Sequence, residues 1–184
     1  MAVTKGRPLA ACREAHALGL AVGENRVQEA LSKLEALPAA EWHLVGHLQR
    51  NKVRRAAGRF ALIQSLDSLE LAEAIARRDP EQQVLLEVNV ARESQKQGCD
   101  PAEAVGLATT LAGLLPLRGL MCVGPLNADP QPAFEELRRL RDLAEQRLGA
   151  PLPVLSMGMS DDFEAALAAG SSMLRLGRFL FGTG

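Results

Sequence analysis

The chain has 184 residues, of which 47% are hydrophobic and 23% charged, and its net charge is −1. This balance suits one folded domain over residues 1–184 and excludes a disordered chain or a bulk electrostatic attraction to nucleic acid or membrane. Three cysteines without C-x-x-C spacing suit a reducing compartment. With no bilayer-spanning apolar run and no signal-peptide pattern at the start, we expect a cytoplasmic protein.

Short apolar runs, which predict strands, alternate along the chain with longer segments of helical periodicity. The predicted strands cover, in chain order, residues 2–4, 20–22, 42–45, 60–63, 84–90, 117–123, 154–155 and 173–176. The helices predicted between and after them cover residues 8–18, 27–37, 48–57, 68–78, 101–115, 132–148 and 163–169. Asp100 and Pro101 suit a helix cap and a first helical residue, and Phe134, Leu137 and Leu140 are predicted to face the core.

Eight predicted strands, nearly all apolar throughout, indicate a parallel sheet that is covered by helices on both faces. Eight strands are the number that closes a (β/α)8 barrel, so we predict this α/β TIM-barrel fold. The loops are expected to be short, because the chain is shorter than the ~250 residues usual for that fold. An open, doubly wound sheet is the alternative.

The segment from Leu155 to Gly177 predicts an anion site. Gly158 can adopt backbone angles that other residues avoid, and Ser160 or Asp161 can cap a helix whose free N–H groups favour a negative charge. An ordinary helix cap without a ligand explains the same residues. The loops after strands seven and eight of such barrels often hold phosphate, so the position of the segment favours a phosphate site.

Lys5 follows the first predicted strand, which lies beside the eighth strand in a closed barrel. A lysine at the end of a buried strand is expected to be desolvated, which makes its amine available as a nucleophile. Together with a phosphate site and Arg175, this amine suits a phosphorylated aldehyde held as a Schiff base, with pyridoxal 5'-phosphate (PLP) as the leading candidate. A solvated lysine is the alternative for Lys5 taken alone.

Six sequence blocks carry a family resemblance over essentially the whole chain. They are AVTKGRP at 2–8, GENRVQE at 23–29, EWHLVGHLQRNK at 41–52, RGLM at 118–121, SMGMSDD at 156–162 and RLG at 175–177. With these blocks the chain resembles the pyridoxal phosphate homeostasis protein family. The resemblance implies a barrel like the N-terminal domain of alanine racemase, here without that enzyme's second domain and without the helix that usually precedes the first strand.

The resemblance also implies roles for individual residues around the cofactor. Lys5 would form the Schiff base with PLP, and Arg175 would face the pyridine nitrogen. Ser160 and the backbone of Gly177 and Arg178 would hold the phosphate. Arg178 stands where many relatives carry a small hydroxyl residue, so we expect its side chain to add a positive charge there.

The same resemblance places Asn25 and His47 in the pocket around the ring, and we expect Met157 to pack at this pocket as well. Lys96, in a Lys-x-Gly context, matches a family lysine linked to a secondary PLP site or to cofactor transfer. The family further implies a part in vitamin B6 homeostasis, with PLP and apo forms of PLP-dependent enzymes as partners, and we expect a monomer.

Two features favour a cofactor carrier over an enzyme. A racemase needs acid–base groups on both faces of the substrate α-carbon, and the tyrosine that serves one face in alanine racemase is missing because the chain has no tyrosine. An arginine at the pyridine nitrogen would also weaken the ring as an electron sink. We therefore expect a PLP carrier or buffer without a firm catalytic activity.

The alternatives to a carrier are enzymes. One is a weak PLP-dependent amino-acid racemase in which His43 or His47 replaces the tyrosine, and the other is a Schiff-base aldolase acting on a phosphorylated substrate. The two histidines straddle a strand end, and no carboxylate completes a metal-binding set with them, so we expect no metal site.

Overall fold

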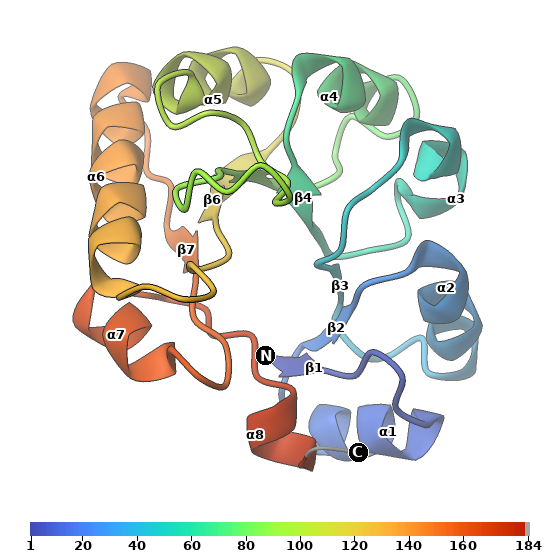
Figure 1. The fold of residues 1–184 in the computed structure, drawn as a ribbon. Coiled ribbons are helices and arrows are strands. Elements are labelled where there is room, and N and C mark those ends of the chain that lie inside the picture. The colour runs from blue at the N-terminus through green and yellow to red at the C-terminus, as the bar shows by residue number, and fades with distance from the viewer. Residues whose placement is uncertain (183–184) are drawn as a thin grey trace.

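The computed structural model describes residues 1–182 as a ring of parallel strands surrounded by helices (Figure 1). Seven strands form one sheet in chain order, and each pairs in parallel with the next. They are β1 (Ala2–Val3), β2 (Val22–Glu24), β3 (Trp42–Leu44), β4 (Leu62–Leu66), β5 (Val84–Glu87), β6 (Leu117–Met121) and β7 (Val154–Ser156). The helices are α1 (Leu9–Ala17), α2 (Val27–Ala36), the 3-10 turn η1 (Arg50–Lys52), α3 (Val53–Ala56), α4 (Leu69–Ala76), α5 (Ala104–Ala112), α6 (Gln131–Leu148), α7 (Phe163–Ala168) and α8 (Arg178–Phe181).

The segment 173–176 closes the ring between the two edge strands. Met173 bridges to Ser156 at the end of β7, and Leu176 bridges to Ala2 in β1, both in parallel. Backbone hydrogen bonds of 2.8–3.2 Å join the segment to both edges. The segment therefore serves as the eighth strand. The predicted (β/α)8 barrel is confirmed, and the open doubly wound sheet is excluded.

All seven strands of the sheet differ from their predicted bounds by one to three residues; the second strand, predicted over 20–22, forms over Val22–Glu24. The strand predicted over 60–63 begins two residues later and runs to Leu66. The strand predicted over 84–90 ends at Glu87, because Val88 pairs instead with Cys99 in the loop that follows. This pairing folds the chain back over the carboxyl end of β5.

Two predicted helices are much shorter than expected, and the other five lie within one or two residues of their predicted bounds. The segment 48–57 forms only the turn η1 and the four-residue helix α3, because Ala57 is extended and Gly58 adopts a φ of +77° that ends the helix. Helix α5 starts at Ala104, and Pro101 belongs to a turn before it. The Asp100 carboxylate accepts a hydrogen bond from the Ala102 backbone N–H at 2.8 Å, so Asp100 caps this turn and not the helix.

The main core lies between the barrel and its helices, and a smaller core fills the barrel itself. Phe134, Leu137 and Leu140 of α6 are buried in the main core, as the helical periodicity predicted. The barrel interior holds a separate apolar cluster, whose buried members are Leu62, Leu85 and Met121. Within residues 1–182, no helix is both long enough and apolar enough to cross a bilayer.

Candidate functional site

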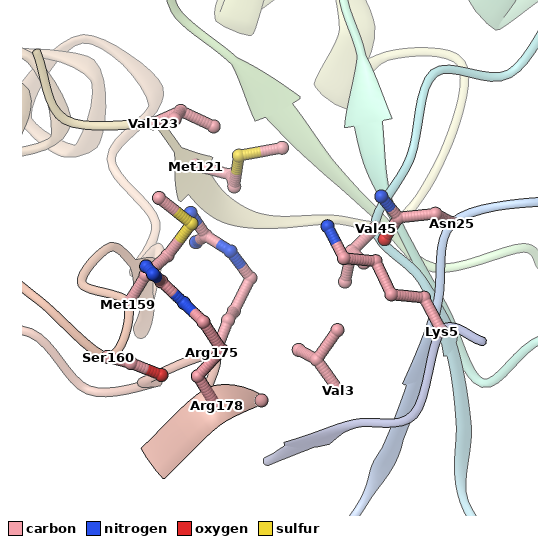
Figure 2. Close-up of a pocket in the computed structure, with 11 residues that line it drawn as sticks. Val3, Lys5, Asn25, Val45, Met121, Val123, Met159, Ser160, Arg175 and Arg178 are labelled. Carbon is pink, nitrogen blue, oxygen red and sulfur yellow. The ribbon is translucent and has the colours of Figure 1, made fainter. Parts of the chain in front are cut away.

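A cavity of about 370 Å³ opens at the carboxyl ends of the strands. Its lining residues come from β1, β6 and the loops after most strands; they are Val3, Lys5, Asn25, Val45, Met121, Val123, Met159, Ser160, Arg175, Gly177 and Arg178. Figure 2 shows Lys5 and Asn25 on one side of the cavity and Ser160 with the two arginines on the other. The mouth of a (β/α)8 barrel is where such folds place their functional groups.

Lys5 lies in a tight turn that leaves β1. The Arg7 N–H donates to the Thr4 carbonyl oxygen at 3.0 Å, which closes a β-turn over Lys5 and Gly6. Gly6 has a φ of +69°, a conformation that glycine adopts without strain. The turn places Lys5 at the surface of the cavity, where the residue is exposed, so the expected desolvation of this lysine is not met.

Ser160 and Arg178 form the polar wall opposite Lys5. The Phe179 backbone N–H donates to Ser160 Oγ at 3.0 Å, which leaves the hydroxyl hydrogen of Ser160 available to an anion. Arg178 pairs with Asp161, and both side chains are largely exposed. This wall thus offers a hydroxyl donor and a guanidinium that is shared with a carboxylate.

The predicted cap of the helix after β7 is wrong. Helix α7 begins at Phe163 after Asp162, and no side chain caps it. Ser160 and Asp161 instead turn toward α8, where they contact its backbone and its first side chain. The Asp162 carboxylate accepts from the Met159 backbone N–H at 2.6 Å, so it orders the loop and not the helix start.

Arg175 lies on the inner face of the eighth strand and is almost fully buried. Its Nη1 donates to Ser156 Oγ at 2.8 Å, and its Nη2 donates to the Cys122 carbonyl oxygen at 2.6 Å. Burial lowers the pKa of the guanidinium, and the nearby groups Cys122 and Glu87 oppose that effect. These contacts hold Arg175 in one orientation at the cavity wall.

A chain of hydrogen bonds continues from Arg175 through the barrel interior. The Ser156 hydroxyl donates to Gln64 Oε1 at 2.6 Å, and Gln64 Nε2 lies 3.0 Å from His43 Nδ1. His43 Nε2 lies 2.9 Å from Glu41 Oε1 at the opposite end of the barrel. Desolvation lowers the pKa of His43, although the carboxylate of Glu41 opposes this, so the imidazole serves as a neutral link in the chain.

Glu87 lies beside Met121, because the two residues are in register across β5 and β6. In-register residues of neighbouring parallel strands face the same side of a sheet, so the Glu87 carboxyl lies in the barrel interior next to the cavity. Burial raises the pKa of Glu87 to about 7; the negative charge of Asp67 adds to this, and Arg175 opposes it. Sequence analysis did not identify this carboxyl.

Asn25 reaches the cavity because the loop after β3 packs directly against its backbone. A Cβ atom at Gly46 would lie 2.2 Å from the Asn25 carbonyl oxygen, so only glycine allows this approach. The Gly46 carbonyl oxygen in turn accepts a hydrogen bond from Ser65 Oγ at 2.7 Å. The glycine of the Val-Gly-His block therefore has a packing role at the site.

The structure does not place three of the predicted residues at the cavity. His47 is exposed beyond the end of β3, and its Nδ1 lies 3.5 Å from Asp67 Oδ2. Met157 is fully buried in the core between barrel and helices. Lys96 lies in the loop after β5, where its ammonium donates to the Gly124 carbonyl oxygen and pairs with Glu93.

The valines that line the cavity, Val3, Val45 and Val123, were not identified from the sequence. Val3 lies two residues before Lys5, and Met121 lies two residues before Val123. Alternate residues of an extended chain share a face, so both members of each pair line the cavity. The parity that puts Lys5 in the cavity would have identified Val3. Within the described part of the chain, no group of three or more His, Cys, Asp or Glu side chains is placed to hold a metal ion.

The fold and this site define a barrel domain whose mouth carries a lysine amine opposite a polar wall of a serine hydroxyl and arginine side chains. The family model described as "Alanine racemase, N-terminal domain" matches residues 1–184. Alanine racemase from Corynebacterium glutamicum, 20% identical, superimposes with a TM-score of 0.82 over 100% of this chain and 55% of its own, which shows the shared fold.

More similar proteins narrow the assignment. Pyridoxal phosphate homeostasis proteins from Aquifex aeolicus and Pseudomonas aeruginosa are each 42% identical over 99% of this chain, which covers 85% and 83% of their lengths. PipY of Synechococcus elongatus, in a structure with PLP bound, is 39% identical and superimposes with a TM-score of 0.88 over 99% of this chain and 91% of its own. The chain belongs to the pyridoxal phosphate homeostasis protein family.

Proposed function

We propose that the chain binds PLP as a Schiff base on Lys5 and serves as a carrier or buffer in PLP homeostasis. The observation that carries this proposal is the cavity itself, which sets Lys5 across from Ser160 and Arg178 (Figure 2). The curated relatives that carry the homeostasis name and the PLP-containing structure of PipY support the same cofactor.

The residues present fit PLP in size and in chemistry. A cavity of about 370 Å³ lies in the ~300–1,000 Å³ range of small-molecule sites. Its polar groups are an amine, a hydroxyl and guanidinium groups, which match an aldehyde and a phosphate. The apolar side chains of Val3, Val45 and Met121 are suited to contact the faces of an aromatic ring.

Each polar residue then has one task toward the cofactor. The Lys5 amine would condense with the aldehyde of PLP: a C=N bond would replace the C=O bond, and the aldehyde oxygen would leave as water. The Ser160 hydroxyl, the Gly177 backbone and the Arg178 guanidinium hold the phosphate. Arg175 would face the ring nitrogen, where a guanidinium donor disfavours protonation of that nitrogen. Asn25 would line the ring pocket on the Lys5 side.

The properties of Arg175 support a carrier. Bound PLP supplies carbanion stabilisation only when its ring can accept electron density, and an arginine beside an unprotonated ring nitrogen weakens this property. The Arg175 side chain is held by Ser156 and by the Cys122 carbonyl, so it is fixed in place. We further propose a cytoplasmic monomer that delivers PLP to apo enzymes, with Lys96 as a secondary contact.

An absorbance titration with PLP tests the proposal. We expect a visible Schiff-base band in the wild-type chain, its loss in Lys5→Ala and its retention in the matched control Lys52→Ala. A full band in Lys5→Ala would refute the assignment of Lys5. Exchange of the α-proton of alanine with solvent, present in the wild type and lost in Lys5→Ala, would instead support the racemase alternative.

A further inference from the structure

The turn that carries Lys5 is held by side chains outside the cavity. The Thr4 carbonyl oxygen, in the peptide group before Lys5, accepts from Lys33 Nζ at 3.0 Å. The Gly6 N–H, in the peptide group after Lys5, donates to Glu29 Oε1 at 2.9 Å. Both peptide groups that flank the reactive lysine are thus bound by residues of α2.

These contacts belong to one ionic cluster between α2 and the barrel. Lys33 Nζ also donates to Glu24 Oε1 at 2.7 Å and to Glu29 Oε1 at 3.0 Å. The Thr4 hydroxyl donates to the same oxygen of Glu24 at 2.6 Å. An ammonium has three hydrogens to donate, so all of the donors of Lys33 are used.

Because this cluster is buried, its ion pairs depend closely on the positions of the charged groups. The Glu24 side chain is fully buried, and the Lys33 side chain is 10% exposed. Desolvation disfavours the charged Lys33, but hydrogen bonds to the two carboxylates outweigh it and raise its pKa. Hydrogen bonds from Lys33 and from the Gly6 N–H lower the pKa of Glu29. The charges therefore remain paired, and a buried pair of this kind tolerates little displacement of either partner.

We propose that Lys33 and Glu29 are positioning residues, which fix the Lys5 turn so that the Lys5 amine faces the polar wall of Ser160 and Arg178. Neither residue lines the cavity, so neither touches the cofactor. The inference rests on the proposed function for its chemical consequence, which is a faster reaction of Lys5 with PLP. The Lys33–Glu24 pair alone attaches α2 to the barrel, whereas the contacts with both peptide groups around Lys5 hold the turn itself.

Glu29→Ala is the most direct test: it removes the Gly6 contact together with the Lys33–Glu29 pair, and it leaves the buried Lys33–Glu24 pair in place. Glu35→Ala is the matched control: it lies on the same helix and removes an exposed ion pair with Arg59 at 3.5 Å that does not touch the turn. Amide hydrogen exchange of Gly6 in the cofactor-free protein reports the order of the turn. The rate at which the Schiff-base band appears after mixing with PLP reports the chemical consequence.

We expect Glu29→Ala to speed Gly6 exchange and to slow the appearance of the band, each by roughly tenfold, while Glu35→Ala changes neither. Glu29→Gln, whose amide oxygen can still accept from Gly6, should restore most of the exchange protection. Wild-type exchange and a wild-type rate in Glu29→Ala would overturn the proposal, even if the melting temperature falls. If the wild-type chain forms no band, the proposed function fails, and Gly6 exchange alone decides whether Glu29 fixes the turn.

Discussion

The buried carboxyl of Glu87 is expected to make the free energy of unfolding fall as pH rises. Glu87→Gln should remove this pH dependence. The residue is 7% exposed in the barrel interior, and its folded-state pKa is about 7 against an ordinary value of 4.5. A raised carboxyl pKa means that the folded state holds its proton more tightly than the unfolded state. The contribution of Glu87 is therefore most favourable below about pH 4.5, declines as pH rises toward about 7, and stays low above that.

The magnitude follows from the same two values. At about 1.4 kcal/mol per pH unit, the difference between about 7 and 4.5 corresponds to about 3 kcal/mol of lost stability at alkaline pH. Glutamine has nearly the same shape and carries no charge at any pH. Glu87→Gln should therefore raise the melting temperature by roughly 6–12 °C at about pH 8.5 and by much less at about pH 5.

Thermal unfolding followed by circular dichroism at these two pH values measures the effect. Glu70→Gln, on the exposed side of α4, is the control for loss of a carboxylate and should change little at either pH. An equal gain at both pH values, or no gain at about pH 8.5, would show that Glu87 is not held protonated by burial and by Asp67.

Two substitutions and one labelling experiment test other parts of the structure. Ser156→Ala removes the hydroxyl that joins Arg175 to Gln64 and should cost about 1–3 kcal/mol in urea unfolding, whereas a cost near zero would contradict the buried polar chain. Phe134→Ala should cost about 3–5 kcal/mol, because this fully buried ring fills the core under α6, and a loss below about 1 kcal/mol would contradict that packing. Burial raises the pKa of Cys122 to about 12, so a thiol reagent at about pH 8 should label it only after denaturant is added, and rapid labelling of the folded protein would refute its burial.

The barrel could be predicted because its strands are short, mostly apolar and regularly separated by helical segments. A short apolar run indicates a buried strand by itself, so the order of strands and helices can be predicted from local sequence. The first and last residues of each element were less predictable, because they depend on contacts with other parts of the chain. Strand β5 stops where Val88 pairs with Cys99, and no local pattern in residues 84–90 shows that competitor.

The site was predictable where it depends on strand order and less so where it depends on loops. Lys5 and Arg175 come together because β1 and the eighth strand are neighbours in a closed barrel. The path of the loop after β7 set the roles of Ser160 and Asp161, which turn toward α8 and not toward α7. Lys33 reaches the Lys5 turn across 29 residues of chain, a contact that spacing within α2 does not show.

Borohydride reduction of the PLP-loaded chain, followed by peptide mapping, tests the central claim most directly. Reduction converts a Schiff base into a stable amine and so marks the lysine that held the cofactor. The chain has four lysines, Lys5, Lys33, Lys52 and Lys96, so the position of the label distinguishes clearly among them. We predict a label on the peptide that contains Lys5, and a label confined to any of the other three would contradict the account.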